Sequence, residues 1–166
     1  AIHKPYQDSW TILSSQIKTF ELTGDKKKLA GISVLDSFTY NNMYFYIPEI
    51  KITKNNTEYI AVMPENKFEI YGDFVTVFPN ATTVLYLNFL SDESLYRTVT
   101  AEYIFAPQIE ITSYKNATLN ENLEIEEGKL WTNVTVGMNK HGTVQSGYNI
   151  DRDSQLTIVD GEIIEG

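Results

Sequence analysis

The sequence of 166 residues contains no cysteine. Disulfide bonds, thiolate metal sites and cysteine nucleophiles are therefore excluded as ways of stabilising or operating this protein. Hydrophobic residues nevertheless make up 42% of the chain, and a chain of this length can bury a substantial core without covalent cross-links. We expect a folded protein that depends on its apolar core.

Long hydrophobic runs are also absent. The longest, Met43–Ile47, ends at Pro48, whereas a membrane-spanning helix needs about 18 to 20 apolar residues. The first residues lack the basic and then apolar pattern of a signal peptide, so we expect Ala1 to be exposed either by signal cleavage or by removal of an initiator methionine. We expect no insertion into a membrane.

Positive charge is scarce. The chain has 13 lysines and arginines against 22 aspartates and glutamates, a formal net charge of −9, and ten of the acidic residues follow Gln108. Such a charge repels nucleic-acid phosphates and anionic lipids. The basic cluster Lys26–Lys28 is typical of a solvated loop. We expect no nucleic-acid partner.

Catalytic signatures are lacking as well. Of the two histidines, His3 is close to the start of the chain and His141 lies in the turn-like run Asn139–Gly142. The chain carries no nucleophile elbow, phosphate-binding loop, dinucleotide-binding glycine motif or zinc-protease motif. We expect no enzyme and no cofactor. A β-sandwich glycosidase or lyase, which needs only two facing carboxylates, stays open as a third functional class.

What the sequence does have is alternation of apolar and polar residues, interrupted by Gly, Pro, Asn or Asp at the spacing of short strands. No segment keeps a helical period. The pattern predicts an all-β fold, an antiparallel β-sandwich of immunoglobulin-like or jelly-roll-like form, with roughly 9 to 12 strands and minimal helix.

Seven strands are predicted in the middle of the chain. They are Glu49–Asn55, Tyr59–Met63, Lys67–Tyr71, Phe74–Phe78, Thr83–Leu90, Thr98–Phe105 and Gln108–Tyr114. Phe74–Phe78 and Thr83–Leu90 are apolar on both phases, which predicts that these two strands lie in the centre of a sheet.

The C-terminal third contains two predicted hairpins. Their turns are Glu126–Lys129, between strands at 123–125 and Leu130–Met138, and Asp160-Gly161, between strands at Leu156–Val159 and Glu162–Ile164. Asp-Gly between alternating strands is a strong hairpin signal, because a type I′ turn needs positive φ at both central residues.

The first 24 residues form a possible N-terminal strand or arm, ahead of a single β-sandwich domain over residues 25–166 with an acidic, hairpin-rich C-terminal part. Trp10–Leu22 is a long strand-like stretch, and we predict that it is added as a donor strand to the sheet of a neighbouring subunit. The alternative is that it forms the first strand of its own domain. The donor side chains would be Trp10, Ile12, Leu13, Ile17, Phe20 and Leu22.

The triplet Asn-x-Ser/Thr, the acceptor for N-linked glycans, occurs four times. The asparagines are Asn55, Asn80, Asn116 and Asn133. Chance alone predicts about two such triplets from the asparagine, serine and threonine content. All four are predicted to face solvent, in turns or on polar strand phases, as glycan attachment requires.

A faint calcium-loop pattern occurs near the end of the chain. Its oxygen ligands would be Asn149, Asp151, Asp153 and Asp160. Ser154 stands where such a loop needs glycine, and no helices flank it. We therefore favour a plain polar turn and assign no metal.

These observations predict a non-enzymatic structural subunit of an extracellular assembly, such as a pilus-like filament at the cell surface, joined by β-strand addition into a homopolymer and possibly N-glycosylated. One alternative is a structural protein of a phage or virus, as a tail, baseplate or fibre component that associates with other virion proteins. Another is a carbohydrate-binding adhesive module with an aromatic platform.

Overall fold

A computed structural model describes residues 2–3, 10–11, 13, 18–22, 27–139, 141–150, 157–159 and 162–165. The strands in these residues are β1 (Ile2–His3), β2 (Trp10–Thr11), β3 (Phe38–Tyr46), β4 (Lys51–Lys54), β5 (Thr57–Ile60), β6 (Lys67–Val77), β7 (Val84–Phe89), β8 (Leu95–Arg97), β9 (Tyr103–Phe105), β10 (Gln108–Leu119), β11 (Ile125–Met138), β12 (Val144–Ile150), β13 (Thr157–Val159) and β14 (Glu162–Glu165). One short helix, α1, covers Ser91–Ser94. The predicted all-β class is confirmed.

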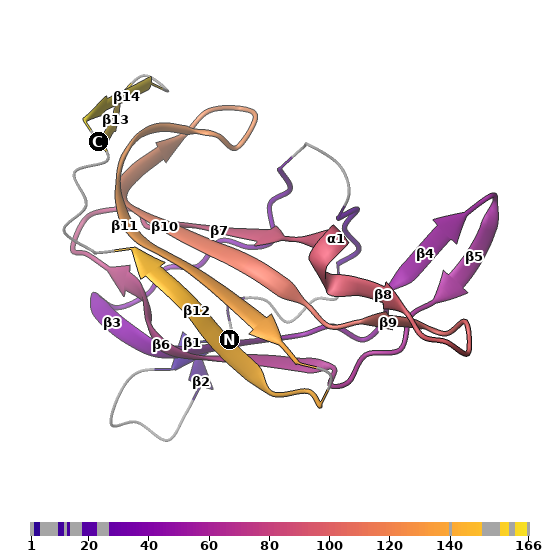
Figure 1. Cartoon of the computed structure of the whole chain (residues 1–166). Helices are drawn as coiled ribbons and strands as arrows, with labels where there is room; N and C mark the ends of the chain where they lie inside the picture. The colour runs from indigo at the N-terminus through magenta and orange to yellow at the C-terminus, as the bar shows by residue number, and fades with distance from the viewer. Residues whose placement is uncertain are drawn as a thin grey trace.

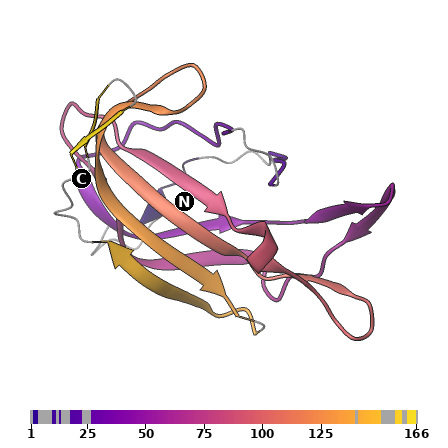
Figure 2. The same ribbon diagram turned by 45° about the horizontal axis from the view of Figure 1, so that its top comes forward.

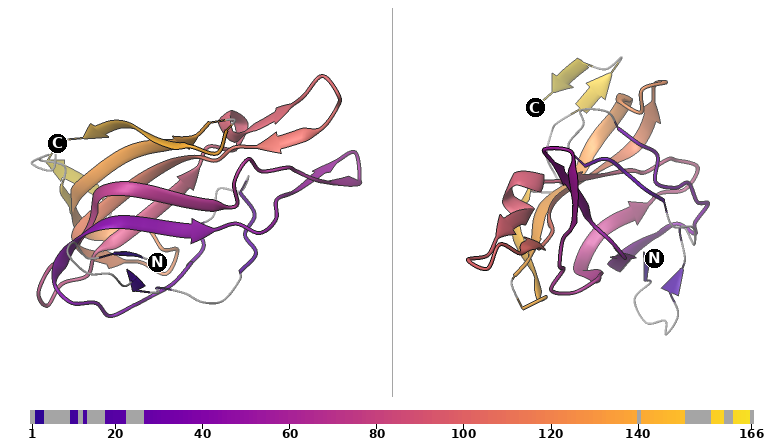
Figure 3. Two further views of the ribbon diagram at one scale, coloured as in Figure 1. Left: turned by 90° about the horizontal axis from the view of Figure 1, so that it is seen from below. Right: turned by 90° about the vertical axis from the view of Figure 1, so that its right-hand side faces the viewer.

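Two antiparallel sheets pack face to face, as a sandwich (Figure 1). The smaller sheet has the order β2-β1-β3-β6. The larger has the order β14-β13-β11-β10-β7, and β12 pairs with β11 on the side opposite β10. Two small hairpins, β4–β5 and β8–β9, project together beyond one end of the sandwich (Figure 3).

The main core lies between the two sheets and takes alternate residues from each. The smaller sheet contributes six buried side chains, which are Ile2, Tyr40, Met43, Phe68, Ile70 and Val75. The larger sheet contributes Ile109, Ile111, Val134, Val136 and Met138. Period-2 burial of this kind is what a strand with one buried face produces, and it is clearest along β11.

The predicted turn at Glu126–Lys129 is wrong, because β11 runs through these residues without a break. The chain reverses earlier, at Asn120, whose side-chain oxygen accepts the backbone N–H groups of Asn122 (2.8 Å) and Glu124 (3.1 Å). Gly128 has a different function: a Cβ there would lie 3.2 Å from the Cβ of Ala117, where β10 is bulged. Glycine inside a strand marks close backbone approach as often as a turn.

Two other strand predictions need correction. Lys67–Tyr71 and Phe74–Phe78 are not separate strands, since β6 is continuous past Gly72, which has φ of 139°. The predicted strand Thr98–Phe105 is too long, because the chain turns at Thr98–Ala101 between β8 and β9, and only Tyr103–Phe105 is a strand. In contrast, the predicted pairing of the strands on either side of Asp160-Gly161 is confirmed: β13 and β14 pair antiparallel, and Val159 lies opposite Glu162. The two predicted turn residues lie outside the described residues.

The N-terminal residues that the structure describes belong to the sandwich. Ile2 is fully buried in the main core and pairs with Met43 of β3. Trp10 lies on β2, and its ring meets that of Tyr44 edge to face at 4.8 Å. Of the predicted strand Trp10–Leu22, only Trp10–Thr11 is in a strand among the described residues.

Candidate functional site

Strand β7 lies at the edge of the larger sheet, and β6 lies at the edge of the smaller sheet. The prediction that Phe74–Phe78 and Thr83–Leu90 lie in the centre of a sheet is therefore wrong for both. Among the described residues β7 pairs only with β10. The side chains on both faces of β7 are apolar because each face packs on a different hydrophobic cluster. One phase faces the main core, and the other joins a second cluster under the curled end of the β10–β11 hairpin. The strand therefore has the side chains of a central strand at an edge position.

The register of β7 shows which backbone groups face the open edge. The N–H of Leu90 donates to the carbonyl of Gln108 at 2.8 Å. Because hydrogen-bonded and non-hydrogen-bonded pairs alternate in an antiparallel ladder, the N–H and C=O groups of Leu85, Leu87 and Phe89 point away from β10. These three side chains lie half-buried against the main core. The edge thus offers backbone hydrogen bonds beside half-buried apolar side chains.

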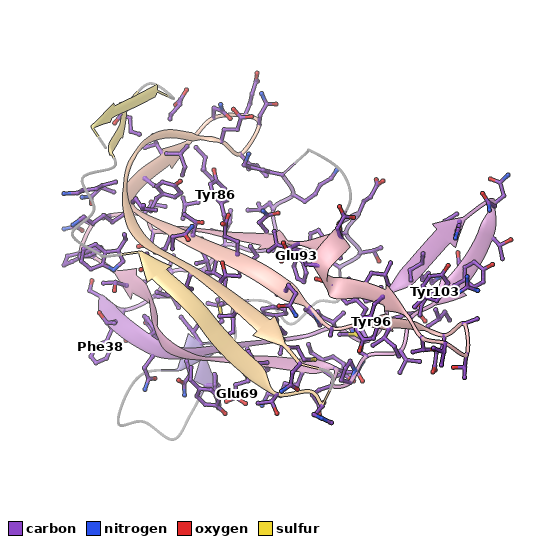
Figure 4. The ribbon with its side chains drawn as sticks, viewed as in Figure 1. Phe38, Glu69, Tyr86, Glu93, Tyr96 and Tyr103 are labelled. Carbon is purple, nitrogen blue, oxygen red and sulfur yellow. The ribbon has the colours of Figure 1, made fainter. Side chains whose placement is uncertain are left out.

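The end of β7 is held in place and is acidic. The buried hydroxyl of Ser94 in α1 donates to the carbonyl of Leu90 (2.7 Å) and accepts the N–H of Gln108 (2.8 Å). This fixes the short helix against β10. Asp92 and Glu93 on that helix are exposed, and neither forms an ion pair with any residue whose position is described. Figure 4 shows Glu93 at the end of the strand that carries Tyr86.

The other face of β7 is anchored by Tyr86. Its hydroxyl donates to the carbonyl of Leu123 at 2.8 Å, and its ring meets that of Tyr114 at 5.8 Å. Burial, and then the charge of nearby groups, raises the pKa of both phenols above the ordinary value. These contacts hold the β10–β11 end over β7 and leave its edge open.

The predicted donor side chains fall in several environments. Trp10 and Leu13 pack against the smaller sheet and the main core, Phe20 is exposed and Leu22 is half-buried. Ile12 and Ile17 lie outside the described residues. The structure does not bring this set together, and its donor function stays a prediction.

The projecting hairpins carry a second group of exposed side chains. The ring of Tyr59 on β5 lies 5.2 Å from that of Tyr103 on β9, and the guanidinium of Arg97 lies 5.4 Å from the Tyr103 ring centre. Tyr96 (43% exposed) and Ile60 (62% exposed) also reach solvent here. Figure 4 shows Tyr96 and Tyr103 near the base of these hairpins. Residues far apart in the sequence meet here, which no local motif could have indicated.

A shallow groove of about 410 Å³ lies between β6 and the start of β12. Both carboxylates that line this groove bind neighbouring residues. Glu65 accepts the backbone N–H of Asn66 at 3.0 Å, and Glu69 pairs with Lys67 at 3.5 Å. The negative charge of Glu69 raises the pKa of the Tyr71 hydroxyl. These contacts tie both carboxylates to nearby residues of their own chain.

Backbone conformation explains why asparagine occupies three of the four predicted glycan-acceptor positions. Asn55, Asn80 and Asn116 are exposed, with φ between 50° and 53°. Asn enters this left-handed region more readily than most residues. Asn133 differs because it lies within β11, and its amide nitrogen donates to the Thr112 hydroxyl at 2.9 Å. Three of the four therefore present a free surface position.

Only one of the four residues of the predicted calcium loop lies among the described residues. Asn149 lies on β12, while Asp151, Asp153 and Asp160 are outside the described residues. Within the described ranges, no three acidic or histidine side chains gather as a metal site would require. In the same part of the chain, no helix has the length and apolar character to cross a membrane.

Comparison of the chain with protein families, with curated proteins and with solved structures finds no match.

Proposed function

We propose that the chain is a non-enzymatic structural subunit that assembles into an extracellular homopolymer, such as a pilus-like filament, by β-strand addition at β7. The observation that carries this proposal is the position of β7, a strand apolar on both phases at the edge of the larger sheet. Natural edges are normally protected by charge, proline, bulges or cover. Val84–Phe89 contains no charged residue and no proline, and its ladder with β10 has no bulge.

Strand addition makes use of both features of this edge. Backbone groups of Leu85, Leu87 and Phe89 would bind the added strand, and its alternate side chains would pack on the half-buried side chains of these three residues. If each subunit donates to the next one, the contact is head-to-tail and does not close on itself, which yields a filament. The same contact would also serve a virion tail, baseplate or fibre.

The test is to block the edge without harming the fold. Leu87→Pro removes an N–H that faces away from β10, so the β7–β10 ladder keeps its hydrogen bonds. Leu87→Val is the matched control, because it keeps the N–H. We expect wild-type and Leu87→Val protein to form concentration-dependent oligomers in sedimentation velocity, and Leu87→Pro protein to remain a folded monomer. Wild-type protein that stays monomeric at all concentrations would overturn the proposal.

The extracellular setting is tested separately by intact mass of the protein from its native source. Excess mass at Asn55, Asn80 or Asn116 over the bare 19.0 kDa chain would support a secreted glycoprotein. A bare mass would remove this support and favour the virion setting.

A second candidate function, carbohydrate binding, is favoured by the exposed tyrosines of the two hairpins. Aromatic rings with polar edges suit stacking on sugars. Tyr59→Ala with Tyr96→Ala should abolish any binding on a glycan panel, with Tyr46→Ala on β3, also exposed, as the control. Binding that survives the double variant would exclude this surface.

A further inference from the structure

Residues 27–35 have the properties of an unpaired strand. The segment follows Lys26 and runs past β7 (Figure 2), where Lys27 Nζ lies 5.6 Å from the ring centre of Tyr86. No backbone hydrogen bond joins it to any described backbone group, and it belongs to no strand. It is an extended apolar segment beside an open edge, and it does not complete that edge in its own chain.

The side chains of residues 27–34 are all exposed, and Leu35 is half-buried. Ile32 is 80% exposed and Val34 is 100% exposed, while the intervening Ser33 donates its hydroxyl hydrogen to the carbonyl of Leu13 at 3.1 Å. Leu35 packs against the main core. Two β-branched residues on one phase, fully presented to water, match what an added strand inserts into a groove.

The segment is held to its own subunit by few contacts. Besides the Ser33 bond, Lys18 Nζ donates to the carbonyl of Ala30 at 2.9 Å. Both are exposed side-chain hydrogen bonds, which contribute little to stability. The small residues Ala30 and Gly31 leave its middle without bulky side chains. Moving this segment onto a neighbour therefore breaks little.

Charge sets its direction on a neighbouring β7. In antiparallel pairing with Val34 opposite Leu85, Ile32 falls opposite Leu87. Lys27 then comes beside Asp92, an exposed carboxylate without an ion pair in the described residues. The reverse direction would bring the lysines to Thr82 and Thr83, which carry no charge. In a chain of net charge −9, this basic start is a suitable counterpart for the acidic end of β7.

We infer that residues 28–34 of one copy form the strand that completes β7 of a second copy, in antiparallel orientation, with Lys27 and Lys28 beside Asp92 and Glu93. This inference rests on the proposed strand addition and names its donor. The donor is then a segment that is separated by five residues from the Trp10–Leu22 stretch predicted from the sequence.

The first experiment uses the full chain. Ile32→Asp with Val34→Asp alters two exposed residues, so the monomer should stay folded. Val99→Asp is the matched control, since Val99 is a fully exposed valine on the β8–β9 turn. We expect the donor variant to lose self-association and the control to keep it. If the donor variant associates as the wild type does while Leu87→Pro does not, β7 is the acceptor and another segment is the donor, which overturns this inference alone.

The second experiment uses peptides and fluorescence anisotropy. A labelled peptide of residues 26–36 should bind wild-type and Leu87→Val protein, and fail to bind Leu87→Pro protein. Glutamate at positions 27 and 28 of the peptide should weaken binding about fivefold, the size of one or two exposed ion pairs. Asp92→Lys with Glu93→Lys in the protein should restore it. Binding of a 10–22 peptide in its place would assign the donor to that stretch. No binding by either peptide, with no self-association, would overturn both proposals.

Discussion

The indole of Trp131 donates a hydrogen bond to the hydroxyl of Thr76 at 3.0 Å, and this bond joins β11 of the larger sheet to β6 of the smaller one. The ring also meets Phe78 edge to face at 5.2 Å, and Lys115 Nζ lies 4.4 Å from its centre. Fifty-five residues separate the bonded pair. The contact fastens the two layers together at the margin of the main core.

Trp131→Phe keeps an aromatic ring and removes the indole donor. We expect the free energy of unfolding to fall by about 2 kcal/mol, because a buried hydrogen bond and part of the ring packing are lost. Urea denaturation followed by circular dichroism measures this. Trp10→Phe is the control, as Trp10 packs on Tyr44 at the sheet margin, and it should cost less. Equal losses would mean that the Thr76 bond is not a special link between the sheets.

Ser113 and Thr132 lie opposite each other on β10 and β11, and both are buried. Neither hydroxyl has a hydrogen-bond partner among the residues that the structure describes. Because an unsatisfied buried hydroxyl costs about 1 to 3 kcal/mol, Thr132→Val should leave the shape unchanged and raise the stability by about 1 kcal/mol. Thermal unfolding by calorimetry measures the shift. A lowered melting temperature would show that a buried water satisfies both hydroxyls.

The β4–β5 turn depends on two asparagines in left-handed conformation, Asn55 with φ of 51° and Asn56 with φ of 61°. Such a turn matches the twist of a hairpin, and alanine is disfavoured in it by about 1 kcal/mol. Asn55→Ala should therefore speed amide hydrogen exchange in β4 and β5 while exchange in β10 and β11 is unchanged, because the hairpin projects from the sandwich. Asn56→Gly should slow amide hydrogen exchange in β4 and β5, because glycine adopts the left-handed conformation without strain. Faster exchange throughout the molecule would mean that the hairpin and the core unfold together.

Alternation in the sequence was enough to predict the class of fold and several strands. Thr83–Leu90 contains β7, Gln108–Tyr114 is the first part of β10, and the strands predicted on either side of Asp160-Gly161 pair as β13 and β14. Strand β3 was missed. Its two polar residues, Asn41 and Asn42, interrupt the apolar pattern where the ladder with β6 shifts its register. A bulge of this kind changes which residues face inward, so simple period-2 counting fails there.

The edge position of β7 could not be read from the sequence. A run that is apolar on both phases predicts burial on both faces, and burial on both faces is what β7 has. Its outer cover comes from Ala117 and Ile125, at the curled end of a hairpin whose turn was predicted in the wrong place. The sequence of Val84–Phe89 does not indicate whether a second strand pairs with β7 on the side opposite β10. The candidate site therefore became visible only from the order of strands.

Tyr86 and Tyr114 should make the fold sensitive to alkali. Burial raises the pKa of both phenols above the ordinary value of 10.0, with lesser contributions from neighbouring charged groups. In the unfolded chain these phenols lose their protons near pH 10, so above that pH the unfolded state binds fewer protons than the folded state, and stability falls as the pH rises. Their contribution is complete below pH 10 and is lost as the pH passes through the raised values.

Tyr114→Phe tests this dependence, since its hydroxyl donates no hydrogen bond in the structure's described residues, whereas that of Tyr86 binds the Leu123 carbonyl. We expect Tyr114→Phe to leave the free energy of unfolding at pH 8 nearly unchanged and to flatten its decline above about pH 10. Tyr46→Phe is the matched control, because it removes an exposed phenol. Urea denaturation at a series of pH values measures all three slopes. A Tyr114→Phe slope equal to that of the wild type would show that this phenol titrates alike in the folded and unfolded chain, and hence that the hairpin end does not close over it.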